Sequence, residues 1–310
     1  MDNRRRQAIC LFIDNYHDLK KHLFLKAPIK QLRLGSLILS LKGHRIDPDE
    51  FRNGLAYIKR HTQWYSPFRR FMVPAAAFSI LPEKSFYAAF NRLAYCGRAL
   101  KDAGFKPSSR TFPAAMALYA ASEEGTERLL AERAFPVFMR MKAWRSTRFM
   151  EQLHVPAVLT AATFLSGKEP TGDEDLLPGS PEAWESDKRQ GLHFLAAILT
   201  YAAGTPDTIR ARCAELYAKL NRMNFKSPSM LYGTLGFLVL SGYDCERVIY
   251  DTLDTMGLLR LGKCFSGFER EQAMLVASAL IAASRSEFPD ESGLTPNPSI
   301  ISAQAAACLL

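Results

Sequence analysis

The chain has 310 residues, of which 48% are hydrophobic and 23% charged, enough apolar surface for a large core and too much for a disordered chain. Its longest apolar stretches, Leu231 to Tyr243 and Ala273 to Ala283, fall short of the roughly 20 residues that span a bilayer, so no membrane span is expected. Six scattered cysteines without a C-x-x-C pair predict reduced thiols, and no secretory signal is recognisable, so the sequence predicts a cytoplasmic protein.

The positive charge is concentrated in the first third of the chain. The net charge is +9, but residues 1–110 carry 21 Lys and Arg against 8 Asp and Glu, whereas residues 111–310 carry 19 against 23. A basic region attracts acidic proteins, anionic surfaces or nucleic acid. Ordinary surface charge is the competing interpretation.

Two kinds of helix alternate along the chain. Apolar residues at i, i+3, i+4 and i+7 predict amphipathic helices with a charged outer face; these cover residues 51–62, 85–103, 127–142, 208–223 and 245–259. More apolar, alanine-rich helices follow, beginning near residues 73, 112, 155, 193, 231 and 274. No alternating strand pattern is present.

A large aromatic residue marks each passage from the first kind of helix to the second. These residues stand 39 to 41 positions apart and are Phe24, Trp64, Phe105, Trp144, Trp184, Phe225 and Phe265. We interpret the three tryptophans among them, Trp64, Trp144 and Trp184, as wedges between helices, in preference to a stacking platform. The regular spacing predicts a helical hairpin about every 40 residues.

The predicted fold is a single all-α domain of about seven hairpins over residues 1–310. It forms an α-α superhelix or, as the alternative, a closed α/α toroid. The units lie near 1–46, 47–83, 84–124, 125–167, 168–204, 205–242 and 243–284, followed by a tail at 285–310. Prolines, glycines and acidic residues predict a loop at 168–182 in place of a first helix. The tail is uncharged from Ser299 onward, so something must cover it.

Motifs for catalysis, metal binding and cofactor binding are missing from the sequence. It has no H-E-x-x-H, G-x-G-x-x-G, Walker A or G-x-S-x-G pattern. His17 and His22 are five positions apart and do not share a helix face, and Asp173-Glu174-Asp175 lacks calcium-loop spacing. We therefore expect no catalytic residue, no metal and no cofactor.

One basic residue recurs near the start of the second helix of most units. A cation there opposes the helix macrodipole by about 0.3–1 kcal/mol, so helix stability does not explain the pattern. Either carboxylates of adjacent units pair with these cations, or the cations form a rim that binds an anion or a partner. The candidate binding residues are Lys30, Arg69, Arg70, Arg110, Arg148, Arg189 and Arg270.

Three segments resemble an uncharacterised bacterial family known only as a domain of unknown function. They are Tyr65-Ser-Pro-Phe-Arg-Arg70, Leu81-Pro-Glu83 and Leu100-Lys-Asp-Ala-Gly-Phe-Lys-Pro-Ser108. The resemblance spans roughly residues 10–240 and is strongest from Leu11 to Lys21 and around Ala103-Gly-Phe105. It implies a helical bacterial protein of the cytoplasm and carries over no catalytic residue. The chain departs from the family pattern at residues 168–182.

These observations favour a non-enzymatic scaffold that binds a protein or peptide partner, with the basic rim recognising acidic groups. A HEAT-like nucleic-acid-binding protein is the second hypothesis and predicts binding that weakens steeply with salt. An α/α-toroid enzyme is the third, and it requires titratable side chains around an open central pocket. Oligomeric state does not follow from the sequence.

Overall fold

The computed structural model describes residues 3–23, 27–80, 85–143, 153–165, 192, 195–202, 205–242, 244–266, 269–285 and 297–310. These residues form helices joined by short turns, and none of them lies in a β-strand. The prediction of an all-α fold is confirmed. No helix in the described part of the chain is both long and apolar enough to cross a membrane.

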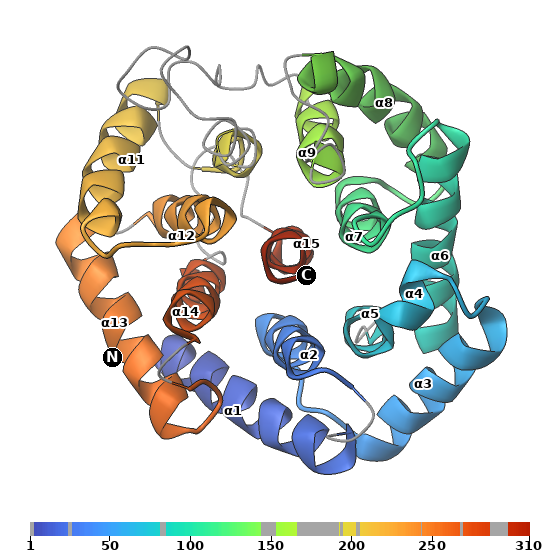
Figure 1. Cartoon of the computed structure of the whole chain (residues 1–310), viewed down its shortest axis with the longest axis horizontal. Helices are drawn as coiled ribbons and strands as arrows, with labels where there is room; N and C mark the ends of the chain where they lie inside the picture. Colours follow the sequence, from blue (N-terminus) through green and yellow to red (C-terminus); the bar gives the residue numbers. More distant parts are fainter. Residues whose placement is uncertain are drawn as a thin grey trace.

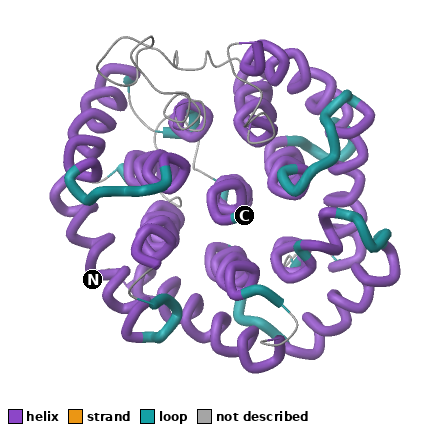
Figure 2. Tube along the Cα trace, in the orientation of Figure 1, coloured by secondary structure: helices purple, strands orange, loops and turns teal. Residues whose placement is uncertain are grey.

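The helices form two concentric layers around a central helix (Figures 1 and 2). The outer layer consists of α1 (Asn3–Leu23), α3 (Pro48–His61), α6 (Phe86–Asp102), α8 (Glu127–Ala143), α11 (Pro206–Asn221) and α13 (Cys245–Leu261). The inner layer contains α2 (Ile29–Leu41), α5 (Met72–Ser79), α7 (Thr111–Ala121), α9 (His154–Leu165), α12 (Pro228–Leu240) and α14 (Arg270–Arg285). The short α4 (Pro67–Arg70) precedes α5, and α15 (Pro298–Leu309) occupies the centre.

Residue composition explains which helices form each layer. The outer α3 buries only Phe51, Gly54 and Ile58, which form one stripe, and its N-cap Asp47 accepts hydrogen bonds from the first turn. The inner α12 is buried at every residue from Met230 to Leu240. A helix that is apolar on all sides is stable only when neighbours surround it.

The ring closes where the last hairpin meets the first. The buried Arg5 of α1 forms ion pairs with α13, including one to Asp254 at 3.0 Å. Arg33 of α2 donates to both carboxylate oxygens of Glu269 at 2.6 and 2.7 Å, just before α14. The sequence predicts an α-α superhelix or, as the alternative, a closed toroid. The described helices adopt the arrangement of the toroid, because the last hairpin contacts the first (Figure 1).

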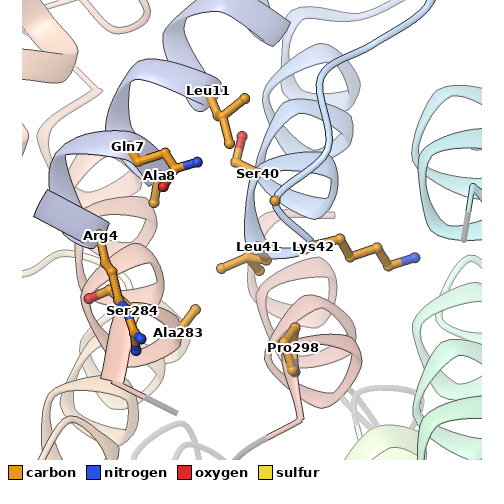
Figure 3. Close-up of a pocket in the computed structure, with 11 residues that line it drawn as sticks. Arg4, Gln7, Ala8, Leu11, Ser40, Leu41, Lys42, Ala283, Ser284 and Pro298 are labelled. Atoms are coloured by element: carbon orange, nitrogen blue, oxygen red, sulfur yellow. The ribbon is translucent and has the colours of Figure 1, made fainter. Parts of the chain in front are cut away.

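The apolar tail noted in the sequence forms the central helix α15, and the inner helices cover it. It packs against α2, α7, α12 and α14. At its end, Arg110 Nη1 donates to the carbonyl oxygen of Ala307 at 2.6 Å, and Cys308 Sγ contacts the carbonyl oxygen of Ser229 at 3.5 Å. At its start, Pro298 lies near the last residues of α2 and α14 (Figure 3). Therefore α15 runs antiparallel to the inner helices and fills the ring centre.

The hairpins give the ring two different ends. At one end, which we call the turn face, outer helices pass into inner helices, for example through residues 62–66, 103–110 and 222–227. At the other end, the return face, inner helices pass back to outer helices, for example through residues 42–47 and 122–126. The last turn of α15 lies at the turn face, since Arg110 and Ser229 lie at the starts of α7 and α12.

The interpretation of Trp64 as a wedge between helices is wrong. Trp64 is 81% exposed, whereas Phe105 and Phe265 at equivalent positions of the repeat are buried and Phe225 is half-buried. The reason is the additional helix α4, which begins at Pro67 and places Phe68 in the gap, in edge-to-face contact with Phe112 at 6.0 Å between ring centroids. The residues Phe24, Trp144 and Trp184 lie outside the described residues, as does the predicted loop at 168–182.

Candidate functional site

The turn face is basic for two separate reasons. The outer helices end with basic residues, such as Lys59, Arg60 and His61 in α3, which complement the negative carboxyl end of the helix dipole. The inner helices α2, α7 and α12 have no acidic residue in their first turn. The return face differs, because acidic residues such as Asp49 and Glu127 lie in the first turns of outer helices there.

Three of the predicted rim residues bind carbonyl groups of neighbouring helices. Arg69 Nη1 donates to the carbonyl oxygens of Lys59 at 2.9 Å and Thr62 at 3.3 Å, at the end of α3. Arg270 donates to the carbonyl oxygen of Met223 at 3.4 Å, just after α11, and Arg110 binds the last turn of α15. The sequence pattern pointed to carboxylates as the structural partners of these cations, and it carries no signal for the carbonyl acceptors.

Of the other four predicted rim residues, two lie in the part of the chain that the structure describes and two do not. Lys30 and Arg70 are exposed and form no ion pair with any described residue. Arg70 lies 5.7 Å from the ring centroid of Phe71. The positions of Arg148 and Arg189 lie outside the described residues. The structure therefore places Lys30, Arg69, Arg70, Arg110 and Arg270 at one end of the ring, without a single shared anion site.

A cavity of about 600 Å³ opens between α1, α2, α3, α4 and α5. Its basic lining combines the rim residues Arg69 and Arg70 with His22, Arg52 and Lys59, which are not among the predicted rim residues, and no carboxylate of a described residue lines it. The apolar lining consists of Leu23, Ala27, Leu55, Ala56, Met72 and Val73. The basic residues of α3 could not indicate this cavity from the sequence alone, because the cavity forms only where α3 lies across from α2 in the folded chain.

The cavity wall is held together by a buried amide. Gln31 lies near the start of α2, and its Nε2 donates to the carbonyl oxygen of Arg70 at 2.9 Å. This bond fixes the end of α4 against α2 and sets the position from which the Arg70 side chain leaves the backbone. Pro28, which precedes α2, provides no side-chain cap for that helix.

Two adjacent aromatic side chains project from the turn that Arg69 holds. Trp64 is 81% and Tyr65 70% exposed, and their rings meet edge to face at 5.7 Å. Exposed large aromatic residues beside arginines are typical of protein interfaces. This pair is the least expected surface feature of the described chain.

A second cavity, of about 400 Å³, lies on the return face between α1, α2, α14 and α15 (Figure 3). Arg4 and Gln7 of α1 line it together with Ser40, Leu41 and Lys42 at the end of α2. The Lys42 amine points away from Arg4 and Gln7, and it donates to the carbonyl oxygen of Phe78. This cavity therefore lacks a convergent set of polar groups.

Metal-ligand side chains do not cluster in the part of the chain that the structure describes. No three His, Cys, Asp or Glu side chains there are placed to hold a metal ion. Among the described histidines, His154 is the buried one; it packs edge to face on Phe105, and its burial and then the nearby Arg110 lower its pKa to about 4. A neutral imidazole in an aromatic cluster is a packing element.

The turn-face cavity and its aromatic neighbours fall within one recognisable stretch of sequence. Residues 15–146 match a family described as protein of unknown function (DUF4003). The DUF4003 match runs from within α1 to just beyond α8 and includes every residue that lines the cavity. No curated protein and no solved structure matches the chain.

Proposed function

We propose that the chain is a non-enzymatic scaffold that binds an acidic protein or peptide partner on its turn face. The observation that carries the proposal is the exposed pair Trp64 and Tyr65 beside the cations Lys59 and Arg70. Trp, Tyr and Arg dominate the binding energy of protein interfaces, because they bury large areas and donate directional hydrogen bonds. Cations around an aromatic anchor favour an acidic partner.

One feature favours a protein over a nucleic acid. The turn face also exposes the aliphatic Leu261, and aliphatic side chains contribute little to backbone phosphate binding.

The enzyme hypothesis receives less support from the ring. It required an open centre with converging titratable groups, whereas α15 fills the centre and is uncharged along its length. Most of its buried side chains, including Ile300, Ile301 and Leu309, are apolar.

The proposal is tested with a fluorescein-labelled peptide in which glutamates alternate with phenylalanines. We expect this peptide to bind the wild type and a lysine analogue of the peptide not to bind. Trp64→Ser should weaken the affinity for the acidic peptide at least about tenfold, which corresponds to about 1.4 kcal/mol. The control variant is Tyr250→Ser, because Tyr250 is 71% exposed on α13 in the outer layer. Equal weakening by both variants would contradict the proposal. So would binding of single-stranded DNA in preference to the acidic peptide.

A further inference from the structure

The turn-face cavity has the size and the divided lining of a small-molecule site. Its volume of about 600 Å³ lies within the range of roughly 300–1,000 Å³ typical of ligand pockets. The apolar part of the lining comes from residues near the ends and starts of α1, α2 and α5, where Leu23 and Val73 are buried, and from Leu55 and Ala56 of α3. The cationic part comes from α3 as well, and from α4.

The cations of this cavity are not neutralised by its own lining. Arg52 pairs with Asp49 outside the cavity, and Arg69 is held by carbonyl oxygens at the end of α3. Lys59 and Arg70 are exposed and form no ion pair with described residues. Because no carboxylate of a described residue lines the cavity, a bound anion would meet attractive charge from several sides.

We propose that this cavity binds a small amphipathic anion, with an apolar body and one oxyanion head. The body packs against the apolar lining, and the head, a carboxylate or a phosphate monoester, accepts hydrogen bonds from Lys59 and Arg70. A purely ionic ligand would leave the apolar lining unused, and a neutral apolar ligand would leave two cations without a partner. This small-molecule site shares Lys59 and Arg70 with the proposed partner surface, but Trp64 does not line it. Trp64→Ser, which should weaken peptide binding alone, and Ala56→Trp, which fills the cavity, therefore distinguish failure of one proposal from failure of the other.

Isothermal titration of the whole chain with octanoate and with octyl phosphate tests the site. We expect at least one of them to bind with one molecule per chain, and the stronger of the two identifies the head group. Octanol has the body alone, acetate the head alone, and octyltrimethylammonium the wrong charge, so all three should bind at least about tenfold more weakly. Equal binding of acetate and octanoate, or of octanol and octanoate, would overturn the proposal, as would no binding of either amphipathic anion.

Four variants locate the bound molecule. Lys59→Gln and Arg70→Gln should each weaken binding about tenfold, the usual effect of losing a charge-assisted hydrogen bond. Arg60→Gln is the matched control, since Arg60 is the exposed neighbour of Lys59 on α3 and does not line the cavity. Ala56→Trp should abolish binding by filling the cavity; Ala56 is exposed, and circular dichroism checks that this variant folds. Unchanged affinity in Ala56→Trp, or equal losses in Arg60→Gln and Lys59→Gln, would place the ligand elsewhere and contradict the site.

Discussion

At the scale of single residues, the cations of the turn face are stabilised by helix ends other than their own. An arginine at the start of an inner helix opposes that helix dipole by about 0.3–1 kcal/mol. A hydrogen bond from a charged donor contributes about 1.5–3 kcal/mol. Arg69, Arg110 and Arg270 each donate to a carbonyl oxygen near the carboxyl end of another helix. The second contribution is larger, so these placements stabilise the ring while they make one face basic.

Lys42, at the end of α2, should make stability depend on pH. Its amine lies 4.5 Å from the ring centroid of Phe78, and burial lowers its pKa from 10.5 to about 7. Between these two values the unfolded chain binds more protons than the folded chain, so the free energy of unfolding rises with pH. In urea titrations, we expect the free energy of unfolding to rise more between pH 7 and pH 9 in the wild type than in Lys42→Met. The two increases should differ by on the order of 1–2 kcal/mol.

Exposed Lys21 supplies the control for this measurement. Lys21→Met should leave the difference between the two pH values as it is in the wild type. Identical slopes in the wild type and in Lys42→Met would show that the Lys42 amine keeps its proton in the folded chain.

At the scale of elements, the central helix α15 combines almost complete burial with one unsatisfied polar side chain. Gln304 is fully buried, and neither its Nε2 nor its Oε1 has a hydrogen-bond partner in the described chain. An unpaired buried polar group costs about 1–3 kcal/mol. The packing of α15 against four inner helices therefore outweighs a local penalty.

Removing that penalty should stabilise the protein. Gln304→Leu keeps a similar volume and eliminates both unpaired atoms, so we expect the free energy of unfolding to rise by about 1–3 kcal/mol in urea titrations. Gln272→Leu is the control with the opposite expected sign, because Gln272 Oε1 accepts a hydrogen bond from Arg33 at 3.2 Å. A loss of stability in Gln304→Leu would mean that Gln304 has a polar partner.

At the scale of the whole molecule, local sequence patterns predicted the helices, and long-range contacts decided their arrangement. The predicted helix at 245–259 corresponds to α13 at Cys245–Leu261. Ring closure depends on Arg5 and Arg33, whose partners lie more than 230 positions away. The 40-residue repeat of the sequence cannot indicate pairs of residues that lie so far apart in the chain.

The candidate site was predictable to a similar degree. The basic positions of the turn face follow from the 40-residue repeat, because equivalent positions of stacked hairpins lie at the same end. The cavity does not follow from it, since Lys59 and Arg70 line one space only through the packing of α3 and α4 beside α2. The exposure of Trp64 was also unpredictable, because it depends on Phe68 taking the buried position.

Closure of the ring should depend on the pair of Arg33 and Glu269. Arg33 is buried, stacks 4.4 Å from the ring centroid of Phe265, and makes a two-fold hydrogen bond to Glu269. Removing one partner of a buried pair usually costs about 3–5 kcal/mol, and we expect the lower end for Arg33→Met because Glu269 is partly exposed. Amide exchange should then accelerate first in α1 and α2, which lose their hold on the last hairpin.

The pair of Arg33 and Glu269 should stabilise the folded chain less as the pH becomes acidic. The hydrogen bonds from Arg33 hold the pKa of Glu269 at about 2, against an ordinary value of 4.5. A lowered carboxyl pKa contributes stability above about pH 4.5 that is lost as the pH falls toward 2. The stability difference between the wild type and Glu269→Gln should therefore shrink over this interval in urea titrations. As a control for Arg33→Met, Arg52→Met breaks an exposed ion pair with Asp49 and should lower the free energy of unfolding by less than about 1 kcal/mol. An equally small loss in Arg33→Met would mean that the pair of Arg33 and Glu269 contributes little to holding the ring closed.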